Sequence, residues 1–100
     1  MPNPSFLGTA LPLIQAPMAG VQGHALAAAV CNAGGLGSIP AAMLSLETLR
    51  NELTQLTALT DQPYNVNFFC HTQPTPDPER EAAWHAALAP YFNEFGIDVN

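Results

Sequence analysis

Short apolar runs alternate with helix-forming segments along this chain, and the alternation constrains its fold more than any other feature. The apolar runs predict strands at residues 11–15, 36–39 and 64–70. Helix-forming segments follow them at residues 24–33, 46–60 and 78–95. Residues 96–99 indicate the beginning of a fourth strand. Because strands that alternate with helices pair in parallel through helical crossovers, the sequence predicts a parallel α/β fold.

Each predicted helix has its own start or stop signal. The first is rich in alanine and is followed by two glycines, which can take the left-handed conformation past a helix end. Ser45 is a candidate cap for the second helix, and Asp77 followed by Pro78 for the third. Pro90 is expected to kink or divide the third helix. Apolar stripes are formed by Leu46, Leu49, Leu53 and Leu56 on the second helix and by Trp84, Leu88, Phe92 and Phe95 on the third.

Three or four parallel strands do not make a closed domain on their own. Such a sheet leaves open edges and an uncovered face. A doubly wound sheet and a (β/α)8 barrel both fit the alternation, and the barrel would need eight βα units, typically about 250 residues. We therefore expect residues 1–100 to form a single incomplete domain.

The charge balance excludes two classes of partner. The formal net charge is -6, lysine is absent, and the only arginines are Arg50 and Arg80. A nucleic-acid binder needs a basic stripe to neutralise phosphates, and an anionic membrane would repel this chain. The first ten residues lack the features of a signal peptide, and no apolar run reaches the length of a membrane span, about 20 residues. The expectation is a cytoplasmic protein with reduced thiols.

Ligands of parallel α/β folds bind outside the carboxyl ends of the strands, so the loops that follow the predicted strands are where chemistry is expected. The loop after Gln15 carries small residues, a proline and a methionine, which suit a flat ligand but also an ordinary turn. Asn67 places an amide in an apolar strand, either to bind a heterocycle or to bond neighbouring backbone. His71 could be an acid or base or a surface residue, and Cys31 and Cys70 are expected in the core. No residues have metal-ligand spacing.

Four stretches of the chain resemble the nitronate monooxygenases, formerly called 2-nitropropane dioxygenases. They are PLIQAPMAG at residues 12–20, AAAVCNAGGLGS at residues 27–38, VNFFCH at residues 66–71 and DPEREAAWHAALAPYFNEFG at residues 77–96. The resemblance implies an FMN-dependent parallel (β/α)8 TIM barrel, of which this chain would supply the N-terminal part, about three to four βα units. It also implies an enzyme that oxidises alkyl nitronates with O2 to carbonyl compounds and nitrite.

The resemblance also implies roles for individual residues. Ala16, Pro17 and Met18 match the family segment that runs along the flavin, and Asn67 matches the asparagine that hydrogen-bonds FMN. The catalytic histidine and the phosphate loops of the family match positions beyond residue 100. No catalytic residue and no metal ligand is therefore assigned here, and the segment alone is expected to be inactive.

Two other functions remain open at this point. FMN-dependent enoyl reductases of fatty-acid synthesis share much of the first two βα units, but they usually have glycines where this chain has Ala16 and Pro17. The chain could also be a non-catalytic fragment or an interaction module. The oligomeric state is not predicted, and a homo-oligomer is compatible with the sequence.

Overall fold

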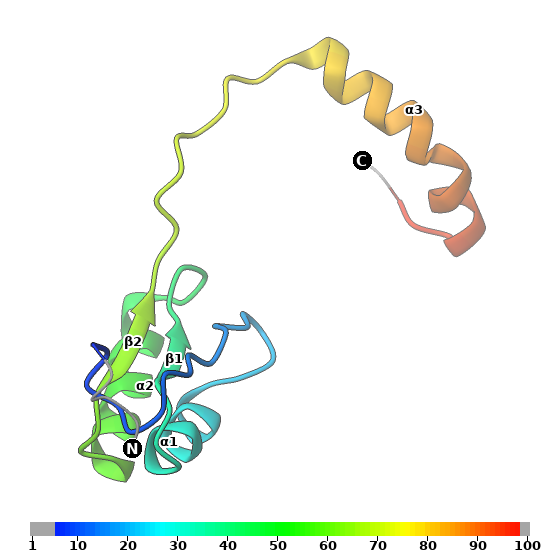
Figure 1. The fold of residues 1–100 in the computed structure, drawn as a ribbon. Coiled ribbons are helices and arrows are strands. Elements are labelled where there is room, and N and C mark those ends of the chain that lie inside the picture. Colours follow the sequence, from blue (N-terminus) through cyan, green and yellow to red (C-terminus); the bar gives the residue numbers. More distant parts are fainter. Residues whose placement is uncertain (1–5, 99–100) are drawn as a thin grey trace. The chain divides into compact units, whose positions relative to one another are not determined.

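The computed structural model describes residues 6–98, which fold into an α/β arrangement with parallel strands (Figure 1). The elements follow in the order α1 (His24–Asn32), β1 (Gly37–Pro40), α2 (Leu46–Leu59), β2 (Tyr64–Asn67) and α3 (Pro78–Phe95). The chain divides into two compact units, Met1–Cys70 with the first four elements and His71–Asn100 with α3. Within residues 6–98, no helix combines the length and the apolar character needed to cross a membrane.

The first predicted strand is present only as an isolated parallel bridge between Ile14 and Leu36. The N–H of Leu36 donates to the carbonyl of Leu13 at 2.8 Å, and the N–H of Gln15 donates to the carbonyl of Leu36 at 2.9 Å. The next backbone donor on this side of the ladder would be residue 17, which is a proline and has no N–H. The prediction of a full strand at residues 11–15 was wrong, because regular pairing in this segment is confined to the bridge between Ile14 and Leu36, and Pro17 prevents the ladder from continuing past Gln15.

The two strands of the sheet pair in parallel, and their register assigns side chains to two faces. Ile39 lies opposite Val66, and both pack in or against the core beside the helices. Ser38 lies opposite Asn65, and the Asn65 amide donates to the Ser38 hydroxyl at 3.1 Å. Because side chains alternate along a strand, Ser38, Asn65 and Asn67 occupy the face that points away from the helices.

The core of the first unit lies between one face of the sheet and the two helices α1 and α2. Its buried residues are Ala27, Ala28, Ile39, Ala41 and Leu56. Partly buried side chains that pack against them are Leu44, Leu49, Leu53, Tyr64 and Val66. Both helices therefore cover the same face of the sheet, and α1 also contacts α2 directly.

Strand β2 ends at Asn67, three residues earlier than predicted. The last backbone bond at this end joins the N–H of Ala41 to the carbonyl of Asn67 at 2.9 Å, and the chain then leaves the sheet. Cys70 is consequently exposed, so its predicted place in the core was wrong, whereas Cys31 is buried as predicted.

Helix α3 begins and ends at chemically suitable residues. The carboxylate of Asp77 accepts the N–H of Arg80 at 3.2 Å, which confirms the predicted cap, and Gly96 takes the left-handed conformation at the other end. The helix continues through Pro90, so the predicted division of the helix was wrong. Ile97 and Asp98 form no strand, and Val99 lies outside the described residues.

Candidate functional site

The candidate site of the first unit lies at the carboxyl ends of the bridged segment and of strands β1 and β2. The loop of residues 16–23 and the loop of residues 41–45 both leave the sheet at this edge. A pocket of about 420 Å³ opens between these loops. It is lined by Ala19, Gly20, Val21, Gln22, Gly23, Ile39, Pro40, Met43, Leu44 and Glu52. This is the edge where parallel α/β proteins bind their ligands.

On the C-terminal side of the bridge between Ile14 and Leu36, Ser38 of β1 makes the contacts with the first segment. It is fully buried, and its N–H donates to the side-chain oxygen of Gln15 at 3.1 Å. Its hydroxyl donates to the backbone carbonyl of Gln15 at 2.8 Å. Side-chain bonds thus replace the ladder at the point where backbone pairing stops.

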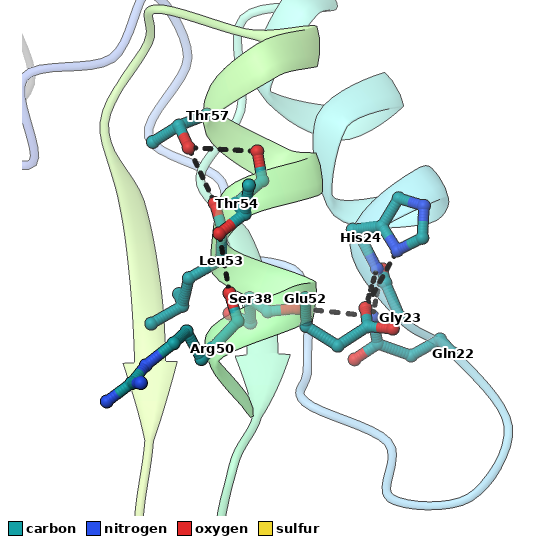
Figure 2. A network of polar contacts seen from close by, with 9 residues as sticks. All are labelled: Gln22, Gly23, His24, Ser38, Arg50, Glu52, Leu53, Thr54 and Thr57. Atoms are coloured by element: carbon teal, nitrogen blue, oxygen red, sulfur yellow. Dashed lines mark hydrogen bonds and ion pairs between the residues drawn. The ribbon is translucent and has the colours of Figure 1, made fainter. Parts of the chain in front are cut away.

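Gln22 completes this replacement from the far end of the first loop. Its amide nitrogen donates to the carbonyl of Ser38 and to the carbonyl of Gly23, each at 3.1 Å. Its amide oxygen accepts the N–H of Met18 at 3.2 Å. One side chain therefore ties the loop both to itself and to β1. Figure 2 shows Gln22 together with Gly23 and Ser38.

Glu52 of α2 caps the first turn of α1. Gly23, which precedes the helix, has no side chain to serve as a cap. The Glu52 carboxylate accepts the backbone N–H of His24 at 2.7 Å and contacts its ring Nδ1 at 2.9 Å (Figure 2). A carboxylate at the positive end of a helix is favourable. These contacts give His24 a structural role at the start of α1.

The residues predicted to contact a flavin lie at the same edge but on two sides of β1. Ala16 and Met18 are exposed and Pro17 is partly buried, while Asn67 closes strand β2. With β1 between them, the two strand positions are separated by two interstrand spacings, about 10 Å. A ligand that touches both would have to extend across the end of β1.

Two polar groups near this edge have no partner among residues 6–98. The side-chain amide of Asn67 makes no hydrogen bond within that part of the chain, so the alternative in which neighbouring backbone satisfies it receives no support there. The amide nitrogen of Gln15 is buried and lacks an acceptor within the same range. These groups and the exposed residues Ala16 and Met18 are compatible with a planar heterocycle that offers hydrogen-bonding atoms along its rim.

Sequence reasoning missed Ser38 and Gln22. The sequence does contain one signal, Pro17, which cannot donate a backbone hydrogen bond to the ladder. Only the register of the sheet shows that the carbonyl left without this donor belongs to Ser38. His71, the other residue considered, is exposed and belongs to the second unit. No group of three or more potential metal-ligating side chains is found in the described part of the chain.

Comparison with known proteins identifies the family. The family model described as nitronate monooxygenase matches residues 3–98. The chain belongs to the nitronate monooxygenase family. A nitronate monooxygenase of Paraburkholderia phytofirmans is 49% identical over 91 residues, which are 91% of this chain and 25% of that protein. A nitronate monooxygenase of Pseudomonas aeruginosa is 52% identical over 93 residues, which are 93% of this chain and 26% of that protein.

Solved structures show the same relationship in three dimensions. The nitroalkane oxidase of Streptomyces ansochromogenes matches with a TM-score of 0.71 and 36% identity, over 90% of this chain and 25% of that one. FabK of Thermotoga maritima matches with a TM-score of 0.61 and 35% identity, over 66% of this chain and 21% of that one. The chain thus spans about a quarter of the length of its relatives in the nitronate monooxygenase family.

Proposed function

We propose that the whole protein is an FMN-dependent oxidoreductase that oxidises alkyl nitronates with O2 to carbonyl compounds and nitrite. The observation that carries this proposal is the family match along residues 3–98, together with about 50% identity to proteins named nitronate monooxygenase. The enzyme class follows from the family, while substrate, oxidant and cofactor are proposed.

The proposal includes the architecture, in which residues 1–100 form one incomplete domain, the N-terminal part of a parallel (β/α)8 barrel. It is supported by the arrangement of the first unit. The bridged segment, β1 and β2 lie side by side in sequence order, and α1 and α2 cover one face. Repetition of such βα units around a closed sheet would put the helices outside and the polar face of Ser38, Asn65 and Asn67 inside.

The residues of this chain that would hold FMN are Ala16, Pro17, Met18 and Asn67. The small Ala16 and the fixed backbone of Pro17 allow a flat ring to approach, and the amide of Asn67, which has no hydrogen-bond partner among residues 6–98, can donate or accept a hydrogen bond. When bound, FMN would supply the electron-transfer chemistry, for which side chains have no equivalent. The chain's part is to position the ring. With a net charge of -6 it offers little to attract an anionic nitronate, so that task falls to the rest of the protein.

The alternative function, an FMN-dependent enoyl reductase that uses a nicotinamide nucleotide, is favoured less. FabK shares the fold with this segment, but its match covers 66% of the chain, whereas the nitroalkane oxidase match covers 90%. A match over 90% of the chain necessarily includes most of the second unit, where the sequence also resembles the nitronate monooxygenases.

The function is tested by mixing the whole protein anaerobically with an alkyl nitronate and recording the flavin absorption. Loss of the oxidised-flavin absorption, reversed by oxygen with release of nitrite, is the expected result. A bound flavin that ignores the nitronate but is reduced by a nicotinamide nucleotide would favour the reductase. A protein that purifies without flavin and binds none would contradict both functions.

Replacing Asn67 by alanine in the whole protein is expected to lower the flavin content. The substitution removes the amide that would bond the ring, and the lost hydrogen bond should weaken binding about tenfold. Asn51→Ala on the exposed surface of α2 is the matched control and should retain wild-type flavin content. Equal flavin content in both variants, measured by absorbance after gel filtration, would return Asn67 to a structural role.

A further inference from the structure

The bridge between the first segment and β1 leaves one buried carbonyl without its ladder donor. Ladder bonds join Leu36 to Leu13 and Gln15, so the next backbone donor to β1 would be the N–H of residue 17, aimed at the carbonyl of Ser38. Pro17 has no N–H. Ser38 is fully buried, and a buried carbonyl without a donor is destabilising.

The amide of Gln22 fills this gap. Its nitrogen donates to the Ser38 carbonyl at 3.1 Å, and its oxygen accepts the N–H of Met18 at 3.2 Å. Because the nitrogen can only donate and the oxygen can only accept, these contacts fix the orientation of the amide. A single side chain therefore fastens the backbone on the C-terminal side of Pro17 to strand β1.

We propose that Gln22 is a positioning residue, which holds the backbone of residues 16–18 at the height and angle needed to lie along the flavin. This role rests on the proposed function, in which that segment contacts FMN. Gln22 would act through Met18 and Ser38 and would not touch the reacting atoms. The structural observation behind it is the juxtaposition of a proline that ends the ladder and a glutamine that bridges its two sides.

Loss of the Gln22 hydrogen bonds should change the position of the loop of residues 16–23 and leave the packing of the core unchanged. Gln22 is only partly buried, and none of its hydrogen bonds involves the core residues Ile39 or Leu56. Pro17 has no N–H with which to hold the loop to β1, so the residues on its C-terminal side lose this hydrogen-bonded connection to the strand once the Gln22 bonds are lost. Loss of position at a binding segment lowers affinity because the ligand must then order the segment.

The test uses Gln22→Met in the whole protein, with Gln55→Met on α2 as the matched control. Methionine preserves the length of the side chain but removes all three of its hydrogen bonds, whereas Gln55 is exposed and makes no side-chain bond among residues 6–98. Gln22→Met should raise the dissociation constant of FMN about tenfold. It should also alter the visible circular dichroism of the bound flavin, while the melting temperature of the flavin-free protein moves by less than about 3 °C.

A third variant separates the two halves of the amide. Gln22→Glu retains an acceptor for the Met18 N–H but cannot donate to the carbonyl of Ser38. We expect its FMN affinity and flavin circular dichroism to match those of Gln22→Met. Wild-type values in Gln22→Glu would mean that the Ser38 contact contributes nothing, which would overturn the proposed replacement of the ladder bond.

Hydrogen exchange supplies a readout that does not depend on flavin. The amide of Met18 donates to Gln22, so its exchange in the flavin-free protein should become about tenfold faster in Gln22→Met. Unchanged exchange and unchanged FMN affinity would overturn the positioning role. A large fall in melting temperature would also overturn it, in favour of a general structural role. If the wild-type protein binds no FMN, the proposed function fails, and the exchange rate of Met18 alone decides whether Gln22 fixes the loop.

Discussion

Replacing Gly37 by alanine is expected to destabilise the protein by about 3 kcal/mol or more, because the new methyl group has nowhere to go. A Cβ built at Gly37 would overlap the backbone carbonyl oxygen of Ala27, and it would lie 2.8 Å from the carbonyl carbon of Ala27 and 2.8 Å from the sulfur of Cys31. Two of these three atoms are backbone, so no rotation of a side chain relieves the overlap. Helix α1 would have to move away from strand β1.

The measurement is the urea midpoint of the purified variant, with the yield of soluble protein as a second readout. Gly20→Ala is the control, because Gly20 has a positive φ of 81° but nothing within 4 Å of an added Cβ. Its cost is conformational only and should be about 1 kcal/mol. If Gly37→Ala were no more destabilising than Gly20→Ala, the direct packing of α1 on β1 at this point would be refuted.

This contact explains why part of the fold could be predicted and part could not. The alanine-rich composition of residues 24–33 predicted a helix, and α1 spans His24–Asn32. The same small residues allow the backbone of α1 to contact β1 at Gly37. Composition does not reveal which glycine of the chain makes this contact. In the sequence, the glycines that precede position 37 indicate only the end of the helix.

Strand boundaries were predicted less well than helices, and the reasons are specific. An apolar run does not show where hydrogen-bond pairing ends. The apolar run of residues 11–15 forms only one bridge, at Ile14, and β2 ends at Asn67, opposite Pro40, although apolar residues continue to position 70. In α3, Pro90 was expected to kink or divide the helix, and one missing donor did not divide it.

The residues of the candidate site, too, could be predicted from the sequence only in part. Sequence similarity to the nitronate monooxygenases pointed to Ala16, Pro17, Met18 and Asn67 as flavin-contacting residues. Their flavin contacts remain predictions. Gln22 does not emerge from such matching, because its importance depends on which carbonyl of β1 faces Pro17. Geometry of this kind requires the register between segments more than 15 residues apart, as the separation of 16 residues between Gln22 and Ser38 shows.

The leucines along α2 follow one sequence pattern but differ in burial. Truncating the buried one is the second substitution that we expect to reduce stability strongly. Leu46, Leu49, Leu53 and Leu56 recur at helical spacing and were predicted as one apolar face. The structure ranks them differently. Leu56 is 0% exposed and belongs to the core, whereas Leu46 is 73% exposed, as the first residue of the helix beyond the edge of that core.

Leu56→Ala is therefore expected to lower the free energy of unfolding by about 3 kcal/mol, the sum of lost apolar burial and the cavity left behind. Leu46→Ala makes the same chemical change on the same helix and should cost less than about 0.5 kcal/mol. Both are measured by urea unfolding under one set of conditions. Equal losses would mean that further parts of the protein cover Leu46 as fully as α1 and the sheet cover Leu56. Negligible losses in both would show that α2 is not anchored by this core, and the placement of α2 against Ile39 and Ala27 would have to be abandoned.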